Sequence, residues 1–292
     1  MKTTVPDKIK AHIIMTDTGE KTFFIRWLPV LTLTLCTFVF NTSEFIPIGL
    51  LTDIGRDFGR TEAEMGWLVT TYAWVVALMS LPLMLLASKM ECRRLMMSVL
   101  ALFVASHVLS AVASNYWILL ASRLGVACSH AIFWSVVSPL AVEVAPKHKT
   151  SAALGLVVAG SSIAMIAGLP LGRVLGLYLG WRMTFLAIGL VAAIALVCLW
   201  RFFPSVHSRN AVAIDKVPAL LSRPALMGIY ILTPLIMTGN FTVYSYIEPF
   251  LAQVTGMLPD RITWVLVAYG AVGILGSWIF SHFFDRRPIG FL

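Results

Sequence analysis

Hydrophobic residues fill most of this chain in long stretches that short polar segments separate. About 20 helical residues cross a bilayer core that is about 30 Å thick, so stretches of this length predict membrane-spanning helices. We expect eight spans, near residues 27–50, 65–87, 95–113, 117–141, 151–175, 182–202, 225–251 and 262–283. The pattern therefore predicts an all-α, polytopic membrane protein with the lipid bilayer as its surroundings.

The composition supports this prediction. Hydrophobic residues make up 59% of the 292 residues and charged residues only 12%, and the mean hydropathy is +0.86. A soluble domain of this size carries about 25% charged residues. A soluble globular protein is therefore excluded.

The polar connection from Pro204 to Pro224 is the one long break between predicted spans. It divides the spans into six and two, and two helical halves with a site at their interface are typical of secondary transporters. The predicted organisation is an N-terminal segment, a six-helix bundle, a linker and an incomplete C-terminal bundle of two helices, at residues 1–26, 27–203, 204–224 and 225–292.

The positive charges predict the orientation in the membrane. If the N-terminus is cytoplasmic, sixteen Lys and Arg residues lie inside, Arg123 lies within a span, and the five outside are Arg56, Arg60, Arg173, Arg182 and Arg261. The positive-inside rule then places both termini in the cytoplasm. The same distribution explains the net charge of +8 and leaves no basic face with interleaved aromatic residues, so we expect no nucleic-acid partner.

The residues that enzymes and metal sites need do not occur at suitable spacings. The four cysteines and six histidines form no metal-ligand pattern, and the chain has no nucleophile elbow or phosphate-binding loop. We therefore expect a protein that is not an enzyme and that uses no metal or cofactor.

Charged residues within the apolar runs are the first functional candidates. An ionised side chain inside a membrane helix costs about 2.5 to 3.5 kcal/mol, so it usually faces a cavity and handles protons, ions or substrate. Glu44, Arg123 and Glu248 are such residues, and Pro249 follows Glu248 directly. The alternatives are a packing carboxyl at Glu44, an arginine that braces carbonyls at Arg123, and a solvated rim carboxylate at Glu248.

Two histidines within spans, His107 and His130, are further candidates for proton coupling. The imidazole titrates near pH 6.5, so either residue could relay a proton. The alternative is that both are packing residues whose ring nitrogens are hydrogen-bonded within the bundle.

Several sequence blocks resemble one family, the major facilitator superfamily, and within it the bacterial sugar efflux transporters that export arabinose and related sugars. The similar blocks lie at residues 40–51, 72–82, 105–110, 129–135, 168–173, 180–185 and 244–250. Together they cover the chain from about residue 26 to about residue 280. Arg123 also resembles the buried arginine of the fourth superfamily helix.

The resemblance implies a multi-pass protein of the bacterial inner membrane that exports sugar, with protons as the exchanged ion. It also implies twelve helices, whereas eight are predicted here, so we expect a chain truncated in its second half and hypothesise that export needs the remaining helices. A multidrug or small-metabolite proton antiporter of the same fold is the first alternative. A membrane remnant that does not transport is an alternative of another class.

A sugar site needs amides and hydroxyls for the sugar hydroxyl groups and aromatic faces for the C–H patches. The predicted cavity residues, each of which has helix packing as its alternative role, are Asn41, Tyr72, Trp74, Trp134, Asn240, Tyr244 and Tyr246. The fifth span also carries small residues at four-residue spacing, which allows close helix contact. The packing motif there comprises Gly168, Pro170, Gly172 and Gly176, and the resemblance implies that the fifth span packs against the eighth.

Overall fold

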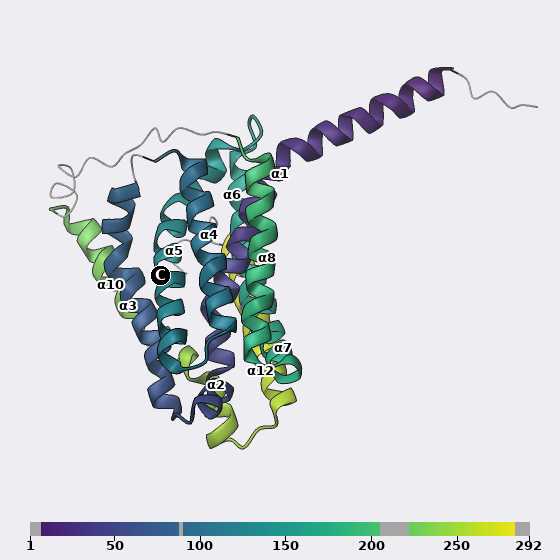
Figure 1. The fold of residues 1–292 in the computed structure, drawn as a ribbon. Helices are drawn as coiled ribbons and strands as arrows, with labels where there is room; N and C mark the ends of the chain where they lie inside the picture. Colours follow the sequence, from purple (N-terminus) through teal and green to yellow (C-terminus); the bar gives the residue numbers. More distant parts are fainter. Residues whose placement is uncertain (1–6, 88–89, 205–221, 284–292) are drawn as a thin grey trace, which may run out of the picture.

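The computed structural model describes residues 7–87, 90–204 and 222–283, and all regular elements in these ranges are helical (Figure 1). Helices are expected in a bilayer because they satisfy their backbone hydrogen bonds internally. The first half contains α1 (Asp7–Gly49), α2 (Leu51–Phe58), α3 (Glu62–Ala87), α4 (Cys92–Ala111), α5 (Tyr116–Glu143), α6 (Thr150–Ile163), the π-helical segment η1 (Ala164–Gly168), α7 (Leu169–Leu179) and α8 (Trp181–Phe202). The second half contains α10 (Pro224–Ser245), α11 (Ile247–Pro249), the π-helical segment η3 (Phe250–Val254) and α12 (Pro259–Phe283).

The predicted spans are present as helices. Seven helices of the described chain are long and apolar enough to cross a membrane, and α12 occupies the eighth predicted span. The boundaries differ in three places. α1 begins at Asp7 and projects from the bundle (Figure 1), the fifth span consists of α6, η1 and α7, and the seventh breaks at Tyr246 into α10, α11 and η3. Most of the predicted linker lies outside the described residues.

The π-helical segment η1 ends two residues before Pro170 in the fifth span. Pro170 has no N–H group, so it cannot donate the helical hydrogen bond to the carbonyl four residues earlier. A π-helical turn is one of the ways in which a helix adjusts to such a break. The fifth span is therefore a bent helix rather than a straight one.

Stacked aromatic rings form the centre of the six-helix bundle. Phe40 of α1 stacks on Phe103 of α4 and on Phe133 of α5, with ring centroids 4.1 and 4.0 Å apart. All three side chains are fully buried. The large hydrophobic cluster around them joins α1, α3, α4, α5 and α8, so this bundle has a core of its own.

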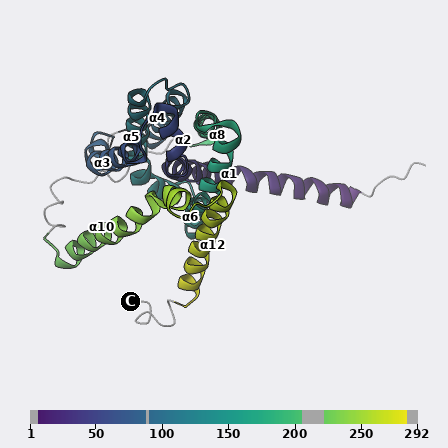
Figure 2. The same cartoon turned by 90° about the horizontal axis from the view of Figure 1, so that it is seen from below.

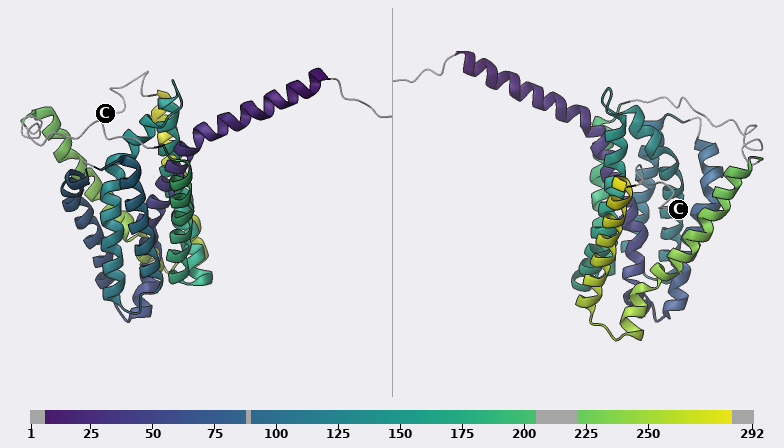
Figure 3. Two further views of the ribbon diagram at one scale, coloured as in Figure 1. Left: turned by 45° about the horizontal axis from the view of Figure 1, so that its top comes forward. Right: turned by 180° about the vertical axis from the view of Figure 1, so that it is seen from behind.

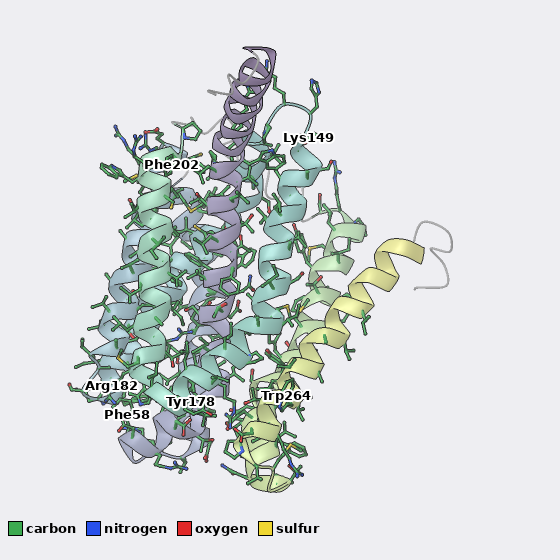
Figure 4. All side chains as sticks on the ribbon, turned by 90° about the vertical axis from the view of Figure 1, so that its right-hand side faces the viewer. Phe58, Lys149, Tyr178, Arg182, Phe202 and Trp264 are labelled. Atoms are coloured by element: carbon green, nitrogen blue, oxygen red, sulfur yellow. The ribbon has the colours of Figure 1, made fainter. Side chains whose placement is uncertain are left out.

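The opposite ends of the bundle can be named by residues that Figure 4 labels. Phe58, Tyr178, Arg182 and Trp264 lie at one end, called here the Arg182 end, and Lys149 and Phe202 lie at the other, called the Lys149 end. At the Arg182 end, Asp57 of α2 accepts hydrogen bonds from Trp181 Nε1 at 3.2 Å and from Arg182. Arg182 also donates to the carbonyl of Ala113 at 2.9 Å, which ties α2 and the α4–α5 connection to the start of α8.

The second half is attached to the first at the Arg182 end. A smaller hydrophobic cluster there contains Phe45, Ile48, Tyr244, Ile262 and Leu266, from α1, α10 and α12. From this cluster α10 diverges from the bundle and from α12 (Figures 2 and 3), and none of the residues in its apolar window is buried. α12 instead lies along η1 and α7. The two halves are therefore joined at the Arg182 end and along η1 and α7, while α10 is attached at one end only.

Candidate functional site

Glu44 of α1 and His130 of α5 form a titratable pair. Oε2 of Glu44 lies 3.3 Å from Nε2 of His130, and the side chains are 30% and 2% exposed. The rings of Phe40, Tyr72 and Trp134 surround the imidazole, with centroids 5.4, 5.6 and 5.9 Å from it. An accessible carboxylate thus lies next to an enclosed imidazole.

Arg123 of α5 compensates for a missing donor in α1. Pro47 has no N–H, so the carbonyl of Ser43, four residues earlier, has no donor within the helix. Arg123 Nη1 donates to this carbonyl at 3.3 Å. The guanidinium is 2% exposed, lies 4.8 Å from the ring centroid of Tyr72, and interacts electrostatically with Glu44. One buried cation therefore connects the bend in α1 to the carboxylate.

Ser43 is also the partner of His107 in α4. His107 Nδ1 lies 2.9 Å from the carbonyl oxygen of Phe103, and Nε2 lies 2.8 Å from Oγ of Ser43. A carbonyl can only accept, so Nδ1 carries the hydrogen and the Nε2 of the neutral ring accepts from the Ser43 hydroxyl. His107 is fully buried, and both of its ring nitrogens are thus hydrogen-bonded.

We call Ser43, Glu44, Tyr72, His107, Arg123 and His130 the polar cluster. Several of its buried atoms have no hydrogen-bond partner within the described residues: Tyr72 Oη, Arg123 Nε and Nδ1 of His130. Most buried polar atoms are hydrogen-bonded, and exceptions often mark a functional site. The cluster thus combines a carboxylate, an imidazole and a guanidinium with spare hydrogen-bonding capacity, which suits proton transfer.

A cavity of about 630 Å³ lies between α3 and α10. Trp74 and Tyr246 line it together with Phe241 and hydroxyl groups that include those of Thr70 and Thr242. The hydroxyl of Tyr246 lies against Gly66, where an added methyl group would collide with it. The structure thus brings two of the predicted cavity residues together at the interface of the halves.

The other predicted cavity residues are not among the residues that line this cavity. Asn41 of α1 faces α6 and donates to Ser161 Oγ at 2.9 Å. Tyr244 is buried in the small hydrophobic cluster and stacks on Tyr269, whose hydroxyl lies 3.5 Å from Oδ1 of Asn240. Tyr72 belongs to the polar cluster, and Trp134, which is 38% exposed, flanks His130.

Glu248 of α11 forms a buried ion pair with Arg173, which the charge distribution places on the outer side of the membrane. Its Oε1 lies 2.7 Å from Nη1 of Arg173, which also donates to the carbonyl of Gly49 at 2.8 Å. Thr52 donates to the second carboxylate oxygen at 3.2 Å. Both charged side chains are 4% exposed. This network joins α1, α2 and α7 of the first half to α11 of the second.

The packing motif of the fifth span faces α1. Methyl groups added at Gly168, Gly172 and Gly176 would collide with Thr42, Ile46 and Leu50 of α1 in turn. Pro170 lies between the first two glycines and is buried. The eighth span packs against the fifth as expected, since α12 contacts η1 and α7 and Gly270 lies against Ile166. The motif glycines themselves lie on the adjoining face, which α1 occupies.

Sequence reasoning missed Arg173, Ser43 and Thr52. Arg173 follows Gly172 within the packing motif, and an arginine at that place could have been examined as a partner for Glu248. Serine and threonine within an apolar helix give no comparable signal, because their hydroxyls often bond to their own helix. The contacts of Ser43 and Thr52 become visible only once the helices are packed.

Comparison with known proteins agrees with this architecture. The family model described as Major Facilitator Superfamily matches residues 33–292. Two proteins of Helicobacter pylori, from strains G27 and P12, are both named "Probable sugar efflux transporter" and are 48% and 47% identical to this chain over 263 residues. The alignments cover 90% of this chain and 67% of each relative.

Solved structures show the same fold. A bacterial homolog of the human lysosomal transporter Spinster, in its inward-facing and unoccupied conformation, has a TM-score of 0.71 at 18% identity. A peptide transporter POT in complex with alafosfalin has a TM-score of 0.55 at 15% identity. This chain spans 64% and 51% of those chains. On the family match and the identity to its relatives, this multi-pass inner-membrane chain belongs to the Major Facilitator Superfamily.

Proposed function

We propose that this chain exports sugars of the arabinose class across the inner membrane in exchange for protons, and that its eight helices suffice, contrary to the hypothesis that export needs twelve. The proposal rests on the relatives named as probable sugar efflux transporters and, above all, on one observation. The carboxylate of Glu44 is partly exposed and lies 3.3 Å from the buried imidazole of His130. A carboxylate in this setting can take up a proton from one side of the membrane and release it to the other.

Arg123 would influence how readily Glu44 takes up and releases its proton. It remains charged and interacts with Glu44 while it donates to the carbonyl of Ser43. When Glu44 is ionised, the guanidinium is attracted to the carboxylate. When Glu44 is protonated, this attraction is lost and Arg123 interacts more strongly with the carbonyl of Ser43. Protonation of Glu44 would therefore change the contacts at the bend of α1.

The cavity between α3 and α10 would hold the substrate. Trp74 and Tyr246 offer aromatic faces for the C–H patches of a sugar, and Thr70, Thr238 and Thr242 offer hydroxyl groups. α10 and α11 contact the first half at the Arg182 end. The charge distribution predicts that the Lys149 end is cytoplasmic, which supports an inward-facing state for this arrangement.

The test is efflux of labelled arabinose from cells that express this chain, with and without a proton uncoupler. A Helicobacter pylori relative serves as the positive control for the assay. We expect export that the uncoupler stops and that Glu44→Gln abolishes, because the amide cannot carry the proton. Glu143→Gln changes an exposed carboxylate at the end of α5 and should leave export unchanged.

Three results would contradict the proposal. Export by the relative but not by this chain would exclude transport by the chain itself. Export that the uncoupler leaves intact would exclude proton exchange. Unchanged, uncoupler-sensitive export in Glu44→Gln would remove this carboxylate from the mechanism, provided that the variant reaches the membrane in equal amounts.

A second candidate is export of lipophilic drugs. The observation in its favour is the apolar part of the cavity lining, which includes Val69, Ala73 and Phe241. Efflux of ethidium in the same cells separates the two proposals. Ethidium export that arabinose does not inhibit would favour a drug substrate, whereas mutual competition would indicate one shared cavity.

A further inference from the structure

A groove of about 440 Å³ lies on the outside of the bundle between α4 and α8, apart from the polar cluster and from the cavity at the interface of the halves. The groove is lined by Met97, Ser98, Ala101, Leu196, Val197 and Trp200. Apart from the Ser98 hydroxyl and the Trp200 indole nitrogen, these side chains are apolar. Oγ of Ser98 donates to the backbone carbonyl of Arg94 at 2.9 Å, so this hydroxyl is satisfied within α4. The wall thus suits a hydrocarbon chain.

Arginines continue the walls of this groove toward the Lys149 end. Residues four apart lie on the same face of a helix. Arg93 and Arg94 therefore extend the face of Met97 and Ser98 on α4, and Arg201 extends the face of Val197 on α8. Three cations thus lie beyond the same end of one apolar groove.

The positive charge at this end is only partly compensated. Arg94 pairs with Glu91 at 3.2 Å, while its side chain remains 81% exposed. Arg93 donates to the carbonyl of Trp200, and neither Arg93 nor Arg201 forms an ion pair in the part of the chain that the structure describes. The nearby Glu143 ends α5, which borders α4 but lies away from α8 (Figure 2).

We propose that this groove binds an anionic phospholipid, with one acyl chain along the α4–α8 wall and the phosphate headgroup between Arg94 and Arg201. A guanidinium binds phosphate oxygens with two parallel hydrogen bonds, and basic sites between membrane helices suit anionic headgroups. The exposed indole of Trp200 lies at the level where an aromatic ring meets the headgroup region. Arg93 contributes charge and holds the two helices together.

Native mass spectrometry of the chain in neutral detergent, with equal amounts of phosphatidylglycerol and phosphatidylcholine of identical acyl chains, tests this proposal. We expect the wild-type chain to retain phosphatidylglycerol preferentially. The double variant Arg94→Gln/Arg201→Gln should lose the preference, with about a fivefold effect for each arginine, since one cation near a membrane surface contributes about 1 kcal/mol. The matched double variant Arg56→Gln/Arg261→Gln removes two exposed cations elsewhere and should keep the preference.

Two further measurements identify the ligand as a lipid. Ala101→Phe fills the groove and should lower the retention of both lipids without changing their ratio. Free glycerol phosphate should not displace the retained lipid, because it lacks the acyl chain. Equal retention of the two lipids by the wild-type chain would overturn the proposal, as would an equal loss of preference in both double variants or displacement by glycerol phosphate.

Discussion

Arg173 and Glu248 hold the two halves together through a single guanidinium nitrogen. Nη1 of Arg173 lies 2.7 Å from the carboxylate of Glu248 and 2.8 Å from the carbonyl of Gly49, the last residue of α1. The cation thus neutralises a carboxylate of α11 and caps α1 at the same time. A cation near the C-terminus of a helix is favourable because it interacts with the last carbonyls.

Removing one partner of this buried pair should destabilise the protein strongly. We expect Arg173→Leu to lower the free energy of unfolding by about 3–5 kcal/mol, because Glu248 is left buried without a counter-charge. Arg173→Leu/Glu248→Leu should recover much of the loss. Thermal unfolding in detergent measures both, with the exposed Arg56→Leu as the control. A double variant that is less stable than the single one would contradict this account.

Pro47 and Arg123 should be energetically coupled. Pro47→Ala restores the N–H that can donate to the carbonyl of Ser43, so Arg123 is no longer its sole donor. We expect Arg123→Gln to be less destabilising in the Pro47→Ala background than in the wild type, by about 0.5–3 kcal/mol, the usual range for interacting neighbours. Equal effects of Arg123→Gln in both backgrounds would show that Arg123 does not stabilise the bend.

The close contact of α6 with α1 predicts opposite effects at two glycines of α6. A methyl group at Gly160 would lie 2.6 Å from the carbonyl oxygen of Thr34, whereas one at Gly155 meets nothing within 4 Å. Gly160→Ala should cost about 1–3 kcal/mol, because backbone must move. Gly155→Ala should be neutral or stabilise by up to about 1 kcal/mol. Unfolding midpoints of the two variants that coincide would argue against this packing.

The ion pair at the start of α8 should contribute far less than the buried one. The side chains of Asp57 and Arg182 are 43% and 39% exposed, so water screens their interaction. We expect Asp57→Asn to lower the free energy of unfolding by less than about 1 kcal/mol. The same unfolding assay checks this value. A loss as large as that of Arg173→Leu would mean that Asp57 holds α2 in place by more than its charge.

The sequence was sufficient to predict the spans, because length and polarity determine which segments can cross a bilayer. The breaks at η1 and Tyr246 depend on hydrogen-bond geometry, which hydropathy does not record. Glu44, His107, Arg123 and His130 could be selected singly as polar residues in apolar runs. Their arrangement around Ser43 could not be predicted, because it depends on how α1, α4 and α5 are rotated against one another. For the same reason the charge count could place Arg173 on the outer side of the membrane but could not predict its burial against Glu248.

Because α10 is attached at one end only, a small rotation at that end produces a larger displacement of its other end. Its 22 residues extend over about 33 Å, and the buried contacts lie near Tyr244, at the end where the chain breaks before Glu248. A rotation of about 10° at that pivot would displace the Pro224 end by about 6 Å. Small rearrangements around Glu248 would therefore be amplified along α10.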